Sequence, residues 1–521
     1  MLVIVAALLT PSGAVNGVAE AFGLHEIGQQ IVSTGVTDRS DSFILARGPM
    51  LSGIRSSDSD SLRAGANGTA GDGTGSALPW AIPASLTQPD TSVVGTPGGV
   101  GAGVGDGAAT ANGGTAATRV DLALLPKLRG TALLGQLALL PRAELSSFVS
   151  HNKGLMASLV KNPPAAREVT AWWATTSPSA RAALAKVSPE VIGNLPGVPF
   201  EVRNGANRSY LNTSIRELKS SMRGLGRGEI VNARVKLHML EQVQKALQSP
   251  TAAATPGSVA PTKSLLTFES DGSGRAAIVV GDLATADYVS YLVPGMFFSV
   301  DTALNTWTNV ATDLNREQTK WVSTLAAHDP SMAGKTVATV AWIGYQTPGI
   351  TGIASLKLAD QGADLMGRAI DGVQAVRSGS EPFVTVIGHS YGSTAAMIEL
   401  AKGAMHVDAL ALIGSPGSAA QTASALSVKN NNVYVGEAAW DPVVNSAFYG
   451  SDPGSGTFGA HRMSVAGGVD PITHHALTAS AGHLGYFAPG SESMRNLALI
   501  GLNHGSLVTQ GTTMDASRTL N

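Results

Sequence analysis

The spacing of apolar residues changes near residue 260. Beyond it, two short apolar runs joined by "SDGSG" are typical of a β-hairpin: "SLLTFE" and "RAAIVVGD". Five more apolar runs follow, separated by segments long enough for helices: "YVSYLVPGM", "TVATVAWIGY", "PFVTVIGHS", "HVDALALIGSPG" and "NNVYVGEAAWDP". A hairpin followed by alternating strands and helices predicts an α/β sheet that is parallel across most of its width.

Residues 120–249 show helical spacing instead. In "TTSPSARAALAKVSPEVIGNL", Ser precedes Pro at 177–178 and 188–189, the arrangement of a helix N-cap and first turn. Apolar residues then recur every three or four positions on both sides of "GLGRG": Leu211, Ile215, Leu218, Met222, Ile230, Leu237, Leu240, Val243 and Leu247. The pattern predicts two short helices in tandem and a helical continuation that ends near Pro250.

Two stretches poor in bulky apolar side chains divide the chain. Gly, Ala, Ser and Thr dominate residues 51–118, which cannot bury enough apolar surface to offset the entropy of ordering. "TAAATPGSVAPTK" is a second, shorter linker. We therefore expect a short N-terminal segment at 1–50, a disordered linker at 51–118, a helical domain at 119–250 and an α/β domain at 263–510.

Composition narrows the classes of function. The 521 residues are 44% hydrophobic, enough for a sizeable core. A net charge of −2 with 14% charged residues offers no basic surface for nucleic acid. The absence of cysteine excludes disulfides, thiolate catalysis and cysteine-ligated metals.

The N-terminal stretch "MLVIVAALLTPSGAVNG" is apolar, but no Lys or Arg precedes it. That missing basic region favours a buried element over a cleaved signal peptide. No other run reaches the roughly 18 apolar residues of a membrane span. A cytoplasmic location and a secreted or cell-envelope location both stay open.

The strongest chemical signal is "VTVIGHSYGSTAA" at 384–396. Val384 to Ile387 predict a buried strand and Ser393 to Lys402 a helix, so G-x-S-x-G falls on a sharp strand-to-helix turn. Such a turn exposes the Ser390 hydroxyl above the sheet, with the Tyr391 amide beside it as an oxyanion donor. The alternative is a structural glycine turn, but the order of strand, turn and helix favours a nucleophile.

Partners of a nucleophilic serine should follow later strands, in the order acid and then histidine. Asp441 comes just after "VYVGEAAW" and is the favoured carboxylate, with Glu437 as its rival. Five histidines come later: His461, His474, His475, His483 and His504. Glycines flank His483, but spacing alone leaves His475 close behind it.

Other positions complete a candidate site. "LVPGMFFS" is the loop after an earlier strand, where Gly295 permits close approach and the Met296 amide is a second oxyanion donor, unless Pro-Gly marks a simple turn. Four aromatic residues line an apolar acyl pocket or pack in the core: Phe297, Phe298, Tyr345 and Phe487. A metal site built from the late histidines is disfavoured, because no recognised ligand spacing is present.

From about Ala171 to Leu507 the chain resembles the actinobacterial α/β-hydrolase family long catalogued as a domain of unknown function. The resemblance rests on a series of motifs in one order: "AWWATTSPSARAAL", "EVIGNLPGVPFEVRNGANRSYL", "YLVPGM", "AWIGYQTPG", "VIGHSYGSTA", "IGSPGS", "DPV", "FGAHR" and "HLGYF". It implies an α/β-hydrolase fold preceded by a helical domain, and it favours Ser390, Asp441 and His483 as the catalytic triad.

These expectations together predict a serine hydrolase that acts on a small-molecule or lipid carboxylic ester without a cofactor. A peptidase, a thioesterase and an acyltransferase could use the same triad. A different class of function is a non-catalytic interaction or secretion-associated module on the same scaffold. Substrate and oligomeric state are not encoded in any recognisable motif.

Overall fold

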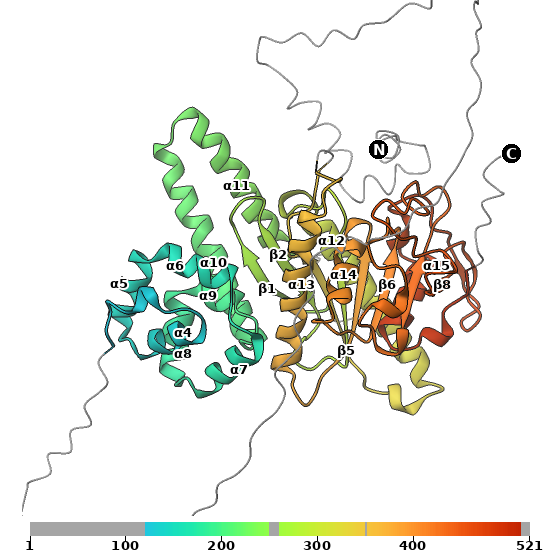
Figure 1. Ribbon diagram of the computed structural model, residues 1–521, viewed down its shortest axis with the longest axis horizontal. Coiled ribbons are helices and arrows are strands. Elements are labelled where there is room, and N and C mark those ends of the chain that lie inside the picture. Colours follow the sequence, from blue (N-terminus) through green and yellow to red (C-terminus); the bar gives the residue numbers. More distant parts are fainter. Residues whose placement is uncertain (1–119, 249–259, 350–351, 512–521) are drawn as a thin grey trace, which may run out of the picture. The chain divides into compact units, whose positions relative to one another are not determined.

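The computed structural model describes residues 120–248, 260–349 and 352–511, all within one compact unit (Figure 1). The predicted segments 1–50 and 51–118 lie outside the described residues, as does most of the second linker. The main sheet of the described part has eight strands: β1 (Lys263–Glu269), β2 (Arg275–Val280), β3 (Tyr288–Val293), β4 (Val337–Ile343), β5 (Phe383–His389), β6 (Ala409–Ile413), β7 (Val433–Gly436) and β8 (His461–Met463).

The strand order is β1-β2-β4-β3-β5-β6-β7-β8. Strands β1, β2 and β4 pair antiparallel, whereas every pairing from β4 through β3 to β8 is parallel. All seven strands expected from the apolar runs are present, and β8 is an addition. A separate two-stranded hairpin pairs β9 (Gly468–Val469) with β10 (Ala476–Leu477).

The helices fall into two groups along the chain. The first comprises α4 (Gly130–Leu139), α5 (Arg142–His151), α6 (Lys153–Lys161), α7 (Ala166–Thr175), α8 (Pro178–Val187), α9 (Pro189–Asn194), α10 (Phe200–Ser221) and α11 (Arg227–Ala246). The second comprises α12 (Val300–Ala326), α13 (Lys357–Val376), α14 (Tyr391–Lys402) and α15 (Glu492–Gly501). Both Ser-Pro pairs start helices, and the Ser177 hydroxyl caps α8 by accepting from the Ala180 amide at 3.3 Å.

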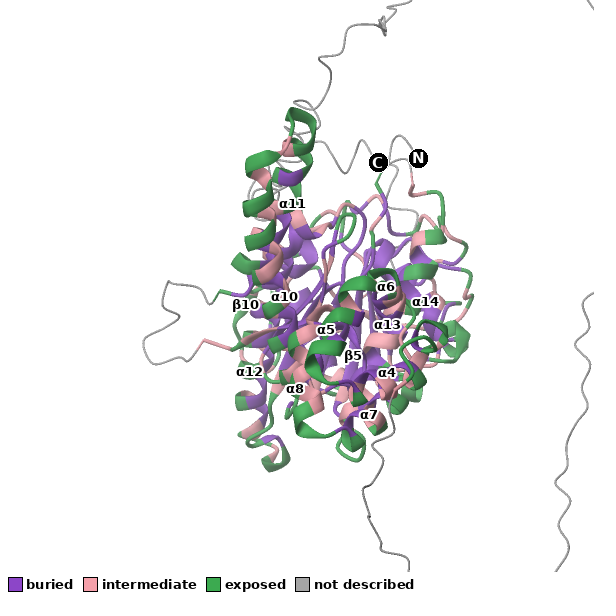
Figure 2. Ribbon diagram, turned by 90° about the vertical axis from the view of Figure 1, so that its left-hand side faces the viewer, coloured by how far each residue is buried: buried purple, intermediate pink, exposed green. Residues whose placement is uncertain are grey.

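Helices cover both faces of the sheet. In β2, Ala276, Ile278 and Val280 belong to the core that includes α12 and α15, whereas Ala277 and Val279 belong to the core that includes α13 and α14. Because side chains alternate between the faces of a strand, burial on both faces requires continuous apolar runs. In Figure 2 the strands of the sheet are coloured as buried, whereas the outer faces of α10 and α11 are coloured as exposed.

Side chains from α9 and α10 cover the free edge of β1. The Asn194 amide group donates to Phe268 O at 2.7 Å and accepts from Phe268 N at 2.9 Å, as a neighbouring strand would. Asn207 donates to Leu265 O at 3.1 Å, and Arg208 donates to Lys263 O at 2.8 Å. An exposed strand edge invites pairing with other chains, so these contacts both satisfy and protect it.

The helices before α10 also bury a core of their own, which includes Leu133, Val169, Trp173 and Ile192. The predicted fold class, a mostly parallel α/β-hydrolase-type sheet with an N-terminal hairpin and a preceding helical region, is confirmed. None of the helices in the described part of the chain is both long and apolar enough to cross a membrane.

Candidate active site

Ser390 lies at the turn from β5 into α14. Its backbone has φ 54° and ψ −131°, a conformation that costs a residue with a side chain about 1–3 kcal/mol. Ser390 N donates to Ile413 O at 2.9 Å, and Ser393 N donates to Ser390 O at 2.9 Å. The helix begins at Tyr391, two residues earlier than expected, so its first amides lie beside Ser390 without acceptors inside the helix.

The two glycines of the G-x-S-x-G motif are steric requirements of this turn. A Cβ atom at Gly388 would lie 2.7 Å from Ser393 Cα. A Cβ atom at Gly392 would lie 2.5 Å from the carbonyl oxygens of Val293 and Pro294. Any larger residue would therefore push α14 away from β3 and β5.

The loop after β3 passes directly over the nucleophile candidate. A Cβ atom at Gly295 would lie 2.5 Å from Ser390 Cβ and 3.0 Å from Ser390 Oγ. The next residue, Met296, is buried, and its amide has no hydrogen-bond acceptor among the described residues. The backbone here can approach Ser390 only because residue 295 lacks a side chain.

Contacts with the segment after β4 hold this loop in place. The buried Tyr345 hydroxyl donates to Pro294 O at 2.6 Å, and Phe297 N donates to Pro348 O at 3.2 Å. Phe297 has a φ of 66°, and its side chain is partly exposed. These contacts give Tyr345 a positioning role, while substrate contacts for Tyr345 and Phe297 stay predictions.

Asp441 and His483 form a buried pair beyond the carboxyl ends of β6 and β7. His483 Nδ1 lies 3.0 Å from both carboxylate oxygens of Asp441. His483 Nε2 is buried without a hydrogen-bond partner among the described residues. The Ser390 hydroxyl therefore makes no hydrogen bond to His483 in this structure. In serine hydrolases without substrate, the distance between the serine oxygen and the histidine nitrogen is often long and shortens when substrate binds.

The rival residues lie elsewhere. Glu437 Oε2 accepts from Arg462 Nη2 at 2.8 Å. His461, His474 and His475 are exposed, and His504 Nδ1 donates to Leu502 O, two residues earlier in the chain, at 2.8 Å. Of the five late histidines, His483 alone contacts Asp441. Within the described ranges, no group of three or more His, Asp or Glu side chains is placed to hold a metal ion.

Hydrogen-bond donors around Asp441 keep its carboxylate ionised. Burial alone would raise the pKa of Asp441, but His483, the Tyr486 hydroxyl and the Val443 amide together hold that pKa below its usual value. Gly414 makes room for the pair, because a Cβ atom there would lie 2.8 Å from Asp441 Oδ2 and 3.1 Å from His483 Nδ1.

The residue before the nucleophile candidate also contacts the pair. His389 Nε2 lies 2.8 Å from His483 O, and because a carbonyl oxygen only accepts, Nε2 carries the proton. Burial, and then the neighbouring His483, lower the pKa of His389 to about 3, so its ring is neutral. Phe298 and Phe487 pack edge-on against this ring and lie within the apolar core.

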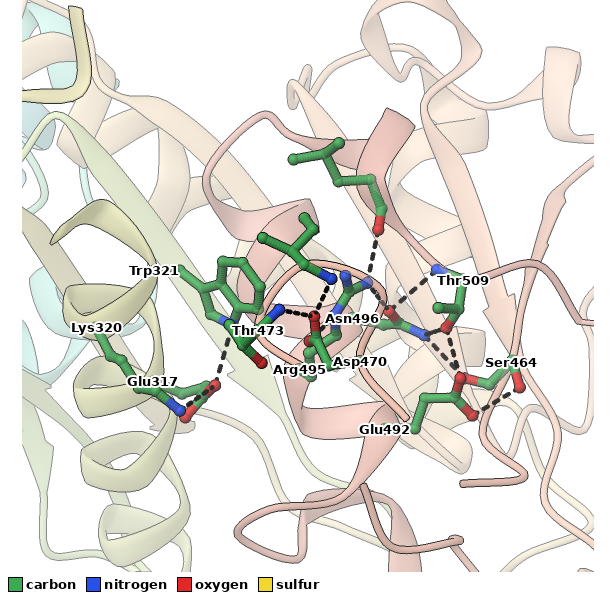
Figure 3. Close-up of polar contacts among 12 residues, drawn as sticks. Glu317, Lys320, Trp321, Ser464, Asp470, Thr473, Glu492, Arg495, Asn496 and Thr509 are labelled. Atoms are coloured by element: carbon green, nitrogen blue, oxygen red, sulfur yellow. Dashed lines mark hydrogen bonds and ion pairs between the residues drawn. The ribbon is translucent and has the colours of Figure 1, made fainter. Parts of the chain in front are cut away.

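A polar network anchors the segment that carries His483 (Figure 3). Glu492 accepts from the Ser464 hydroxyl at 2.6 Å, which joins the two ends of the segment. Arg495 donates to Asp470 at 2.9 Å, and its guanidinium lies over the ring of Trp321 on α12. The long loop after β8 is thus tied to α15 and α12, so His483 is held by packed elements.

Comparison with known proteins shows what this part of the chain is similar to. A family model described as "Alpha/beta hydrolase" matches residues 269–450. The predicted resemblance to an α/β-hydrolase family is thereby confirmed. Ser390 and Asp441 fall inside the matched residues, and His483 lies beyond them.

Curated proteins that are similar to this chain in sequence include proteins of mycobacteria. An uncharacterised protein of Mycobacterium tuberculosis is 29% identical over 390 residues, covering 65% of this chain and 56% of the relative. The chain therefore spans little more than half the length of that protein. An uncharacterised protein of Mycobacterium bovis is 29% identical over 225 residues, covering 42% of this chain and 77% of the relative.

Solved structures that match this chain include an arylesterase, at 10% identity and a TM-score of 0.29 over 58% of this chain and 98% of that one. A hyperthermophilic esterase from Pyrobaculum calidifontis has 13% identity and a TM-score of 0.28 over 57% of this chain and 97% of that one. Likenesses at these TM-scores carry no inference about activity.

Three residues of the site were not singled out from the sequence: His389, Gly414 and Tyr486. Each lies inside a motif of the family resemblance, but motif membership does not reveal a contact. Their roles depend on distances between segments far apart in the chain. A left-handed φ of 54° at Gly414 is the kind of backbone requirement that sequence alone leaves unmarked.

Proposed function

We propose that this α/β hydrolase cleaves carboxylic esters through Ser390, His483 and Asp441. The observation that carries the proposal is the combination of a left-handed Ser390 at the start of α14 with a buried Asp441–His483 pair. A strained backbone at the N-terminus of a helix serves a nucleophile, which needs exposure to substrate and donors for the oxyanion. A structural turn gains nothing from that strain.

In the proposed mechanism, Ser390 Oγ attacks the ester carbonyl carbon while His483 Nε2 takes the hydroxyl proton. The carbonyl oxygen becomes an oxyanion, to which the Tyr391 and Met296 amides donate. Collapse of the intermediate expels the alcohol, which takes the proton from His483 and leaves an acyl-enzyme. Water, activated by the same nitrogen, then releases the carboxylic acid and restores Ser390.

The role of Asp441 in this mechanism is electrostatic. Its carboxylate fixes the Nδ1–H tautomer of His483 and stabilises the positive imidazolium formed during attack. The depressed pKa of Asp441 supports this role, because the carboxylate then stays charged at neutral pH. We also propose that residues 263–510 form the catalytic domain and 119–250 a helical domain that covers the edge of β1.

The apolar surroundings favour esters over peptides. Phe298 and Phe487 pack against His389, next to the nucleophile candidate, so the core beneath Ser390 supplies no charged or amide group that would bind a peptide backbone. A thioesterase and an acyltransferase would use the same intermediate with a different leaving group or acceptor, so they are the alternatives that kinetics must separate. A non-catalytic module is the alternative that an inactive protein would favour.

The proposal is tested by turnover of p-nitrophenyl esters of rising acyl length, with matched thioesters and anilides. The S390A variant should lose essentially all turnover, whereas S424A, which removes an exposed hydroxyl, should match the wild type. Ester turnover that survives in S390A would overturn the assignment of the nucleophile. Faster cleavage of thioesters than of esters would mean that the protein is a thioesterase that uses the same proposed triad.

A further inference from the structure

Tyr486 lies behind the Asp441–His483 pair, and the proposed mechanism does not use it. It sits in a short 3-10 helix, Gly485–Phe487, three residues after His483, and its side chain is fully buried. Its hydroxyl lies 2.6 Å from Asp441 Oδ2 and 2.8 Å from Ala438 N. The phenol therefore bridges the end of β7 and the carboxylate.

The direction of the phenolic proton follows from these two partners. The Ala438 amide can only donate, so the Tyr486 oxygen accepts from it. The hydroxyl proton is then free to be donated to Asp441 Oδ2. Burial and the nearby Asp441 carboxylate raise the pKa of Tyr486 well above its usual value, so it is a permanent donor.

Asp441 is held from three sides. Oδ1 accepts from the Val443 amide at 2.9 Å, Oδ2 accepts from Tyr486, and both oxygens face His483 Nδ1. A carboxylate whose oxygens are fixed by donors on both sides of its histidine cannot rotate away from it. Hydrogen bonds to a charged group are also about twice as strong as neutral ones.

We propose that Tyr486 is a positioning residue that fixes the plane of the Asp441 carboxylate toward His483 and limits its basicity. The inference rests on the proposed function of the triad. The other titratable groups near Asp441 are His483, the neutral His389 and Glu437, whose charge is paired with Arg462. Tyr486 is the donor to Asp441 that a single-atom substitution can remove.

The test compares Y486F with Y291F. Both substitutions delete one buried phenolic oxygen, but the Tyr291 hydroxyl has no hydrogen-bond partner among the described residues. We expect Y486F to lower kcat about tenfold or more with KM changed less than about twofold, and Y291F to match the wild type. The acidic limb of the kcat/KM profile of Y486F should move to higher pH, because the Asp441–His483 pair without that donor binds a proton more tightly. A purely structural Tyr486 would leave that limb in place.

A second measurement does not depend on turnover. The ¹³C resonance of the Asp441 carboxyl, followed against pH, should have its midpoint at higher pH in Y486F than in the wild type and Y291F. If the wild type hydrolyses no ester, the proposed function fails while this titration still decides the role of Tyr486. An unchanged midpoint would overturn the inference.

A further variant tests the inference even if the Y486F protein does not fold. Site-specific 3,5-difluorotyrosine at position 486 keeps the ring and hydroxyl but makes the hydroxyl a stronger donor. It should move the Asp441 midpoint to lower pH, the opposite direction to Y486F. A midpoint that stays fixed or moves upward would contradict the inference.

Discussion

The neutral, buried His389 predicts a specific loss of stability in acid. The residue is 1% exposed, its Nε2 donates to His483 O at 2.8 Å, and burial lowers its pKa from 6.5 to about 3. Below pH 6.5 the unfolded chain takes up a proton that the folded protein refuses until about pH 3. The stabilising contribution is therefore complete above pH 6.5 and is lost as the pH falls towards 3.

The size of the effect follows from the two pKa values. At pH 5 the unfolded histidine is almost fully protonated and the folded one is almost fully neutral. The resulting difference in the free energy of unfolding between pH 8 and pH 5 is about 2 kcal/mol. A folded pKa one unit higher than 3 would change this value by less than about 0.1 kcal/mol, so pH 5 is the right point for comparison.

Urea unfolding at pH 8 and pH 5 tests this prediction on the wild type, H389Q and H475Q. Glutamine keeps an amide donor near His483 O but does not titrate, and His475 is an exposed histidine. The wild type and H475Q should each lose about 2 kcal/mol more than H389Q between the two pH values. Equal losses in all three proteins would refute the reasoning, because His389 would then not be held neutral.

Two further predictions concern the fold. N194A removes both hydrogen bonds to the backbone of β1 and should lower the free energy of unfolding by about 2–4 kcal/mol. The control N212A, on the exposed side of α10, should lower it by at most about 0.5 kcal/mol. Chemical denaturation measures both values, and equal losses would contradict the inference that Asn194 protects the edge of β1. G205A adds a methyl group where no atom lies within contact distance, so it should stabilise α10 by about 1 kcal/mol. G392A places a methyl group against the carbonyl oxygens of Val293 and Pro294, so it should destabilise the protein by about 1–3 kcal/mol and abolish activity. Thermal melts compare the two variants, and a gain in stability for both would contradict the steric requirement for glycine at 392.

The sheet could be predicted well because the strands from β2 to β7 are buried on both faces. Continuous apolar runs such as those of β4 and β5 then stand out from the surrounding helices without knowledge of tertiary contacts. Strand β8 was missed for the opposite reason. Its three residues run from exposed to buried, and the strand is defined by its pairing with β7. Short edge strands leave almost no local signal.

The pairing of candidate site residues was harder to predict. The order of strand, turn and helix was enough to propose Ser390 as the nucleophile. The choice of His483 over His475 needed the family resemblance, since both lie in Gly- and Thr-rich loop sequence. Their difference arises from packing: His483 is buried beside Asp441, and His475 lies on the exposed β9–β10 hairpin.

The roles of the aromatic residues also could not be predicted from the sequence. Sequence could not separate pocket-lining side chains from core, and the structure gives them different surroundings. Phe298 and Phe487 pack around Trp307 and His389, while the Tyr345 hydroxyl bonds Pro294 O in the loop over Ser390. Such roles depend on where a side chain ends, and the sequence specifies only that it is large and apolar.

The most direct test of a nucleophilic Ser390 is labelling of the folded protein with a fluorophosphonate probe, followed by peptide mass spectrometry. We expect a single adduct on Ser390 in the wild type and in S424A, and none in S390A. Labelling should be slower in D441N, because His483 then loses the charge that supports it. No adduct on Ser390 in a folded wild-type protein, or equal labelling of S390A, would contradict the claim that this serine is an activated nucleophile.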